Sequence, residues 1–315
     1  KAYTTAASGL IKRMAEAVFF MLCTFISLVR AKPANVYVST NPPVVVPFIV
    51  AVYCRLFNAN YVYHLQDIHP EAVNIVVPLN GLVLRMLKGI DNYTLRHAKV
   101  IITLSEDMKA YIQQRSNTRS PIYLLDNPSF EVTPVPMAQR TKDIVFCGNA
   151  GRLQRIPLLM TAIREYLQKG GNLWFTFAGG GVYAQDLKAL ADAHEQVDYL
   201  GFIPATEAAE LVNNHRWALL PIDDEVTKYA FPSKSSGYAL SGSGVIAVCG
   251  AQTSVARWVQ KLKVGVVCEA DHDALVNCFF LLEQREGESF TVVDEIREQL
   301  QISYFAQRLQ DMVFF

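Results

Sequence analysis

Charge is sparse in this sequence, and neither sign is in excess. Lysine and arginine number 29, aspartate and glutamate also number 29, and charged residues make up 18% of the 315 positions. A net charge of zero gives no bulk attraction for nucleic acid, so we expect no nucleic-acid partner. Hydrophobic residues make up 51% of the chain, which excludes a disordered or fibrous protein and suffices for two domains with separate cores.

The sequence also lacks the cysteine spacing of a zinc site or a disulfide framework. No two of its cysteines form a Cys-x-x-Cys pair, and most stand in apolar runs. We therefore expect reduced, mostly buried thiols in a cytoplasmic protein. The six are Cys23, Cys54, Cys147, Cys249, Cys268 and Cys278.

No apolar run reaches the length of a membrane-spanning helix, which needs about 20 residues. The most hydrophobic stretch, residues 14–29, is shorter and contains Glu16. No small-residue cleavage site follows it, so we do not expect a signal peptide. We favour a buried helix lying on a sheet, and a helix resting on a membrane surface is the alternative.

Strand and helix patterns alternate along the chain, which predicts an α/β fold with parallel sheets covered by helices. Strands are expected at 35–39, 61–65, 100–104, 122–125, 143–147, 174–178, 197–200, 217–221, 245–248 and 265–268. Helices are expected at 43–57, 79–96, from Ser105 onward, and at 156–168, 184–193, 206–213, 233–241, 254–261 and 292–313, the last with a break near Ile302.

Three prolines fall within residues 127–136, and no hydrophobic period runs through them. This composition is typical of a linker. We therefore expect a first domain at 1–127, a linker at 128–142, a second domain at 143–295, and a final helix at 296–315 that crosses back. The first domain opens on a helix, so we expect it to lack the strand and glycine-rich turn that usually open a doubly wound domain.

Three segments, taken together and in order, resemble glycosyltransferase family 4, in the bacterial O-antigen and capsule branch that includes N-acetyl-fucosamine transferases. They are Val62-Tyr-His-Leu-Gln-Asp-Ile-His-Pro-Glu71, Phe146-Cys-Gly-Asn-Ala-Gly-Arg152 and Phe231-Pro-Ser-Lys234 with the following Gly242 and Val245-Ile-Ala. The resemblance implies a GT-B fold, in which two Rossmann-like domains face a cleft.

The same resemblance implies an activity. A sugar would move with retention of configuration from a nucleotide-sugar donor, most simply a UDP-sugar, to a lipid-linked saccharide. The reaction would need no metal or other cofactor and would take place at the inner face of the cytoplasmic membrane, with peripheral membrane contact. A non-catalytic GT-B subunit and a GT-B sugar-nucleotide epimerase are the alternatives.

The donor site is expected around a glycine-containing turn between a strand and a helix. Backbone N–H groups at a helix N-terminus favour an anion, and Arg152 and Arg155 can add forked donors to a diphosphate. A plain turn with two solvated arginines is the alternative. The resemblance adds further donor-binding residues, namely Gly148, Asn149, Gly151, Gly180 and Phe202. For Gly180 and Phe202 a plain turn is the alternative, since a strand-to-helix turn needs glycine anyway.

The Pro232-Ser-Lys234 segment is a second part of the expected donor site. Ser233 is a good N-cap, which is also its plain structural interpretation. Lys234 in the first helical turn opposes the helix dipole, and an anionic ligand would remove that mismatch. The family has a glutamate three residues after this lysine, where it binds ribose hydroxyls, whereas this chain has Gly237.

Titratable residues gather at the end of the strand expected at 61–65. His64, Asp67, His69 and Glu71 follow one another there, and ligands of open α/β sheets bind outside the carboxyl ends of strands. We expect His64 and Asp67 to be catalytic, facing the sugar and the acceptor hydroxyl. The alternative is that the acids only begin a helix. No metal site is expected.

Overall fold

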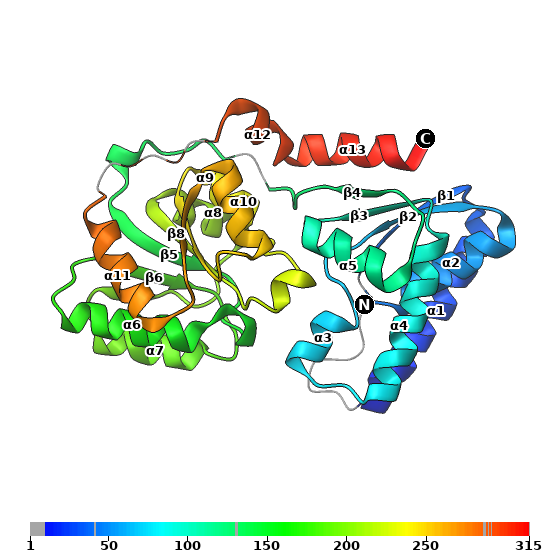
Figure 1. Ribbon diagram of the computed structural model, residues 1–315, viewed down its shortest axis with the longest axis horizontal. Helices are drawn as coiled ribbons and strands as arrows, with labels where there is room; N and C mark the ends of the chain where they lie inside the picture. The colour runs from blue at the N-terminus through cyan, green and yellow to red at the C-terminus, as the bar shows by residue number, and fades with distance from the viewer. Residues whose placement is uncertain are drawn as a thin grey trace. The chain divides into compact units, whose positions relative to one another are not determined.

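The structure is a computed structural model that describes residues 10–40, 42–129, 132–285, 288, 290 and 292–314. The chain divides into two compact units (Figure 1). We call Lys1–Leu125 with Ala306–Phe315 the N unit, and Asp126–Phe305 the C unit. Each contains one fully parallel sheet, so the predicted α/β class is confirmed.

The N unit has a four-stranded sheet whose spatial order follows the chain, β1-β2-β3-β4. Because parallel crossovers are right-handed, an order that advances in one direction places the crossover helices on one face. The strands are β1 (Asn35–Ser39), β2 (Asn60–His64), β3 (Val100–Thr103) and β4 (Ile122–Leu124). The helices are α1 (Leu10–Ala31), α2 (Val45–Phe57), α3 (Glu71–Val76), α4 (Gly81–His97) and α5 (Glu106–Ser116).

Helix α5 shows how local sequence sets the element bounds here. The Ser105 hydroxyl accepts the amide of Met108, as expected for an N-cap. Glu106 and Asp107 occupy the first turn, where the helix dipole favours acids. The helix ends on Asn117 in the left-handed conformation. The short helix α3 was not predicted.

The expectation that residues 14–29 form a buried helix on a sheet is wrong. Helix α1 packs against α2, and no described side chain from Glu16 to Ala31 is buried. Apolar side chains such as Val18 and Leu22 are exposed. Hydrophobicity alone does not distinguish a helix enclosed by the core from one with an outward apolar face.

The described helices include none that is long and apolar enough to cross a lipid bilayer.

The C unit has a six-stranded sheet in the order β10-β9-β8-β5-β6-β7. The chain runs outward from β5 through β7, and then returns to β8, on the other side of β5. The strands are β5 (Lys142–Cys147), β6 (Phe175–Ala178), β7 (Val197–Tyr199), β8 (His215–Pro221), β9 (Gly244–Val248) and β10 (Gly265–Cys268).

Helices cover both faces of this sheet (Figure 1). One layer packs onto a core in which Tyr166 and Phe279 both meet Phe175 edge-on, with ring centroids 5.9 and 5.1 Å away. That layer consists of α6 (Ile156–Gln168), α7 (Ala184–Ala193) and α11 (His272–Glu283), of which α11 was not predicted. The other consists of α8 (Ala205–Asn213), α9 (Ser235–Ser241) and α10 (Ser254–Leu262).

The described residues of the proline-rich linker, 128–129 and 132–142, belong to the C unit. Arg140 is buried, and its guanidinium donates to the carbonyls of Ser241 at 2.6 Å and His215 at 2.7 Å. Its Nε donates to the Val135 carbonyl at 3.0 Å, and the Val135 amide donates to the Asn213 side chain at 3.0 Å.

The chain closes with α12 (Asp294–Gln299) and α13 (Ile302–Phe314), so the tail is helical and broken near Ile302 as predicted.

All six cysteines are free. Cys54, Cys249 and Cys268 are buried, as expected, whereas Cys23 is exposed on α1.

Candidate functional site

Strand β5 marks the point in the C unit where the strand order reverses, since its neighbours are β6 and β8. In open parallel sheets, ligands bind outside the carboxyl ends of the strands at such a switch point. The turn after β5 therefore occupies the position where this architecture forms a ligand site. It contains most of the residues expected to bind the donor.

The loops that follow β5, β6 and β7 are joined by backbone hydrogen bonds. The amide of Gly148 donates to the Ala178 carbonyl at 2.7 Å, and the amide of Ala150 donates to the Gly180 carbonyl at 2.7 Å. The amide of Gly179 donates to Gly201 at 2.6 Å. The amides of Gly148 and Ala150 are thus used within the protein and are not open to a ligand.

Glycine is required at two of these positions by close backbone contact. Gly179 has a φ of 121°, and an added Cβ would overlap the Gly148 carbonyl oxygen. Gly181 has a φ of 136°, and an added Cβ would lie 2.5 Å from the Ala150 carbonyl oxygen. The glycine triplet after β6 therefore lets the two loops approach each other.

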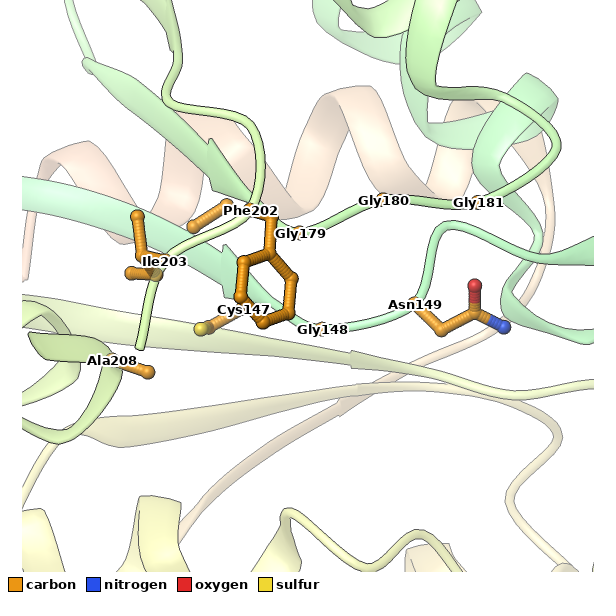
Figure 2. Close-up of a pocket in the computed structure, with 10 residues that line it drawn as sticks. Cys147, Gly148, Asn149, Gly179, Gly180, Gly181, Phe202, Ile203 and Ala208 are labelled. Atoms are coloured by element: carbon orange, nitrogen blue, oxygen red, sulfur yellow. The ribbon is translucent and has the colours of Figure 1, made fainter. Parts of the chain in front are cut away.

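A pocket of about 470 Å³ opens over these loops (Figure 2). The Phe202 ring stands beside the end of β5 and is 87% exposed, although aromatic side chains are usually covered. Four predicted donor residues line the pocket: Gly148, Asn149, Gly180 and Phe202. The other lining residues are Cys147, Ala178, Gly179, Gly181, Ile203 and Ala208.

Lys234, in the loop before α9, is not one of the lining residues, but it lies against Gly148, which is. A Cβ added to Gly148, whose φ is 143°, would overlap Cε and Nζ of Lys234, so the ammonium occupies the space that a side chain would need. The same ammonium lies 4.6 Å from the Phe146 ring centroid. Burial lowers the pKa of Lys234 to about 8. Within the described residues, no carboxylate forms an ion pair with it.

The prediction that Ser233 caps the following helix is wrong. Helix α9 begins at Ser235, and Lys234 occupies the N-cap position without a side-chain capping bond. Ser233 is exposed in the preceding turn. The hydroxyls of Ser235 and Ser236 are buried and have no hydrogen-bond partner in the described chain. Buried hydroxyls usually find a partner, so these two are unusual.

The two predicted arginines, Arg152 and Arg155, differ in their exposure and in their partners. Arg152 begins a short 3-10 helix, Arg152–Gln154, and is exposed. Arg155 donates to the Ile222 carbonyl at 3.0 Å and forms an ion pair with Asp224 at 3.0 Å. Asp224 also accepts the Gly250 amide at 3.1 Å. Arg155 thus connects loops, whereas Arg152 is open to a ligand.

The remaining predicted donor residue, Gly151, precedes Arg152. Its amide donates to the Gln154 side chain at 3.1 Å. Gly151 is buried and does not line the pocket.

Gly237 lies in the first turn of α9, three residues after Lys234. A Cβ added there would lie 3.1 Å from the Ser129 hydroxyl. That hydroxyl is the end of a flexible side chain, so a larger residue at 237 needs only a small local adjustment.

Tyr238 holds the candidate site in place through a contact that the sequence did not reveal. Its hydroxyl donates to the Cys147 carbonyl at 3.1 Å and accepts the Cys147 amide at 3.2 Å. It therefore fixes the end of β5 beside Gly148. No local motif signals this role, because the partners are separated by 91 positions.

In the N unit, His64 is 1% exposed at the end of β2. Its Nδ1 is 2.6 Å from the Tyr37 hydroxyl. Burial lowers the pKa of His64 to about 4, so the ring is neutral at pH 7. Burial also raises the pKa of Tyr37 to about 12. In this conformation His64 offers almost no surface to a substrate.

Asp67 is more accessible and lies near His69. Burial raises the pKa of the Asp67 carboxyl, and His69 opposes the shift. Burial lowers the pKa of His69, opposed by Asp67 and Glu71. The His69 Nδ1 is buried and without a partner in the described chain.

Glu71 is the first residue of α3 and belongs to a buried ionic network. It accepts from Arg115 at 2.8 Å and from the Tyr111 hydroxyl at 2.6 Å. Arg115 also forms an ion pair with Asp91 and donates to the His69 carbonyl at 3.2 Å. For Glu71 the helix-start interpretation fits better, because its oxygens are bound by the protein. The network holds the loop that carries Asp67.

No group of three or more histidine, cysteine, aspartate or glutamate side chains in the described residues could hold a metal ion.

No protein-family model matches the chain. A curated relative, named "Probable glycosyltransferase WbjE", from Pseudomonas aeruginosa, is 21% identical over 257 residues. The matched region covers 76% of this chain and 63% of the relative, so the chain spans less than two thirds of that protein's length.

Solved structures resemble the chain over nearly its whole length. Sucrose-phosphate synthase from Thermosynechococcus elongatus matches with a TM-score of 0.71 at 14% identity, over 97% of this chain and 79% of that one. Anabaena Alr3699/HepE in complex with UDP matches with a TM-score of 0.63 at 15% identity, over 94% and 81% respectively. The lipopolysaccharide outer core galactosyltransferase WaaB matches with a TM-score of 0.66 at 14% identity, over 98% and 82%. The two parallel-sheet units therefore have the GT-B fold, as predicted.

Proposed function

We propose that the chain is a glycosyltransferase that binds a nucleotide-sugar donor, with UDP as its nucleotide, in the pocket of the C unit. The observation that carries the proposal is the Lys234 ammonium over Gly148. A largely buried cation without a carboxylate partner in the described chain is costly, and an anionic ligand would compensate its charge. The likeness to a UDP-bound GT-B structure and to a relative named as a glycosyltransferase supports this choice.

In this proposal, different residues around the pocket bind different parts of a nucleoside diphosphate. Lys234 and Arg152 neutralise the diphosphate, and they stabilise the charge that develops on it as the sugar leaves. Phe202 offers an exposed ring beside the pocket on which a base can pack. The orphaned hydroxyls of Ser235 and Ser236 are two further donors beside Lys234. Arg155 acts indirectly, by tying the Asp224 loop to the turn.

The reaction we propose is a metal-independent transfer with retention of configuration to a lipid-linked saccharide of the bacterial envelope, with peripheral contact at the inner face of the cytoplasmic membrane. Two cationic side chains take the place that a divalent metal has at other diphosphate sites. Asp67 is the accessible acid proposed to face the acceptor hydroxyl. The catalytic role of His64 stays a prediction, and its burial makes Asp67 the better candidate for substrate contact.

Gly237 favours a second candidate, a GT-B protein that binds a nucleotide without transferring a sugar. The ribose-binding glutamate that the resemblance implies has no equivalent at this position. A sugar-nucleotide epimerase is a third possibility within the same fold. Product analysis with UDP-sugars, with and without a lipid-linked acceptor, separates transfer, epimerisation and simple binding.

Thermal unfolding in the presence of UDP tests the donor site. A ligand that binds only the folded state raises the melting temperature by mass action. We expect UDP to stabilise the protein and Arg152→Ala to remove most of the shift. Arg164→Ala, on the unrelated helix α6, is the matched control and should keep the full shift. Absence of any shift with UDP, GDP or dTDP at millimolar concentration would contradict the proposed site.

A further inference from the structure

A second pocket, of about 360 Å³, lies at one edge of the six-stranded sheet of the C unit. Residues of the edge strand β10 and of helix α11 line it, and it shares no lining residue with the pocket over the glycine loops. Its lining includes two cysteines, Cys268 and Cys278, together with Arg285. The proposed nucleotide site uses none of these three residues.

The fold brings the two cysteines together from different elements. Cys268 is the last residue of β10, and Cys278 lies in the second turn of α11. The chain turns back after β10, so α11 packs against the strand that precedes it. Cys268 is part of the hydrophobic core, and Cys278 packs against that core. Their thiol groups consequently meet at the pocket, where they form a hydrogen bond with each other.

The two thiols differ in their surroundings. Cys268 is 5% exposed, whereas Cys278 is only half-buried. The hydrogen bond between them raises the pKa of Cys268, and burial adds to this effect. The same bond lowers the pKa of Cys278 against the effect of burial, and the Arg285 guanidinium lowers it further. Cys278 therefore has the character of a nucleophilic thiolate with a protonated thiol beside it.

This arrangement is typical of a redox-sensitive site, in which an accessible low-pKa cysteine stands next to a second thiol. The Cys268 sulfur is also 3.5 Å from the Glu269 carbonyl oxygen, a further acceptor that favours its protonated form. A metal site fits less well, because the described residues contain no group of three or more histidine, cysteine, aspartate or glutamate side chains that could hold an ion. Inert core thiols fit less well too, because Cys278 lies at a pocket and within the influence of a cation.

We propose that Cys268 and Cys278 form a redox-sensitive dithiol, which a hydroperoxide oxidises to an intramolecular disulfide. In the first step, the Cys278 thiolate attacks one peroxide oxygen, and the O–O bond breaks. The released hydroxide or alkoxide takes up the proton that Cys278 had lost, and Cys278 becomes a sulfenic acid. The Cys268 sulfur then attacks the Cys278 sulfur, so that an S–S bond forms, the S–O bond breaks, and water leaves with the Cys268 proton. Both sulfurs are oxidised, and the peroxide is reduced.

Mass spectrometry of a tryptic digest tests the proposal on the full chain. Trypsin cleaves after Lys263 and Arg285, so both cysteines fall in one peptide, 264–285, while Cys249 is the single cysteine of peptide 235–257. The folded protein is treated with a small molar excess of hydrogen peroxide, which is then removed, and the chain is unfolded and alkylated without reduction. We expect more than half of peptide 264–285 to lack two hydrogen atoms and to resist alkylation, while the Cys249 peptide is alkylated. Dithiothreitol added before alkylation should restore both sites.

Two serine variants test the separate roles of the cysteines, since serine keeps a hydrogen-bond donor at each position. In Cys268→Ser, oxidation of Cys278 should stop at the sulfenic acid, which dimedone labels. In Cys278→Ser, labelling of Cys268 should be lower by about tenfold or more, because a protonated thiol reacts poorly. Equal labelling would overturn the assignment of Cys278 as the nucleophile. Cys23→Ser, which removes an exposed single thiol, is the matched control and should form the disulfide like the wild type.

Circular dichroism and thermal unfolding, measured before and after oxidation, show whether the fold persists. A disulfide that forms only in protein without a cooperative unfolding transition would overturn the proposal, because the thiols would then have met in an unfolded chain. Full alkylation of both cysteines after peroxide treatment of the folded wild type would also overturn it, and so would oxidation of Cys278 to the sulfinic acid without a disulfide. These outcomes need no variant, so they hold where a substitution impairs folding. The test does not depend on the UDP-induced shift, which belongs to the other pocket.

Discussion

The ammonium of Lys234 occupies the space above Gly148 in which any other residue would place its Cβ. These two residues stand 86 positions apart in the sequence, one in the turn after β5 and the other before α9. Because Gly148 has no side chain, it leaves room for the ammonium, and its amide hydrogen-bonds the neighbouring loop.

Gly148→Ala should therefore damage both stability and nucleotide binding. A φ of 143° is unfavourable for alanine, and the new methyl group would displace the Lys234 ammonium. We expect a loss of about 2 kcal/mol in the free energy of unfolding, the typical cost of such backbone strain, together with loss of the UDP-induced shift. Gly180→Ala is the control, since its added Cβ meets nothing within 4 Å in the same pocket. Equal effects of the two substitutions would mean that the contact with Lys234 is unimportant.

Lys234→Met should separate stability from binding. The folded-state pKa of about 8 lies below the ordinary value of 10.5, so the folded protein disfavours the charged form. The stability of the wild type should consequently rise between pH 8 and 10.5, where the unfolded chain still binds the proton, and Lys234→Met should lack this rise. Methionine should leave stability at pH 7 unchanged or higher, yet weaken UDP binding by about tenfold or more. Denaturant unfolding across pH and calorimetric titration with UDP measure the two quantities.

UDP affinity of the wild type should decrease as the pH rises above about 8, because the neutral amine no longer attracts the diphosphate. Bound UDP favours the charged form, so the midpoint of the decrease should lie above the value for the free protein. An affinity that stays flat up to pH 10 would indicate that Lys234 does not contact the phosphates.

Gly237→Glu tests whether position 237 faces the nucleotide. A glutamate there could accept hydrogen bonds from ribose hydroxyls, and replacing glycine inside a helix stabilises it by up to about 1 kcal/mol. We expect tighter UDP binding and an unchanged fold, after a small shift of the Ser129 hydroxyl. Gly237→Gln controls for side-chain bulk. Nucleotide affinity that does not change with either residue would favour the interpretation as a non-transferring GT-B protein.

Two buried histidines should make both units sensitive to acid. His64 in the N unit and His215 in the C unit each have a pKa lowered to about 4, mainly by burial. As the pH falls from about 6.5 to 4, the unfolded chain gains protons that the folded chain does not, so stability falls. Each histidine should remove up to about 3 kcal/mol over this range. His215→Gln should reduce the loss for the C unit, and an unchanged acid transition in this variant would contradict the argument.

Local signals predicted most of the elements in these two units. Helix α6 has the predicted bounds, 156–168, since its apolar period is regular and Gly170 follows it closely. Helix α11 was missed although Asp271 caps it, accepting the amides of Asp273 and Ala274. The start of α9 was placed too early, because Ser233 has the composition of a cap without its geometry.

The candidate site was only partly predictable, because some of its contacts join residues that are far apart in the sequence. Glycines and cations could be located as motifs, and the switch point at β5 follows from the strand order. The contact of Lys234 with Gly148, and that of Tyr238 with Cys147, depend on the packing of distant segments. Whether an apolar helix is enclosed or faces outward, as for α1, likewise depends on tertiary structure.

The buried guanidinium of Arg140 has a consequence for how the C unit opens. It joins the proline-rich segment to carbonyls at the ends of β8 and α9, so that segment cannot leave the surface without exposing the buried charge. The amide protons of Val135, Gln139 and Arg140, each hydrogen-bonded there, should therefore exchange with solvent deuterium only when this anchor releases. Their protection would follow the local opening of the C unit, as one cooperative group, rather than the fast exchange usual in an irregular loop.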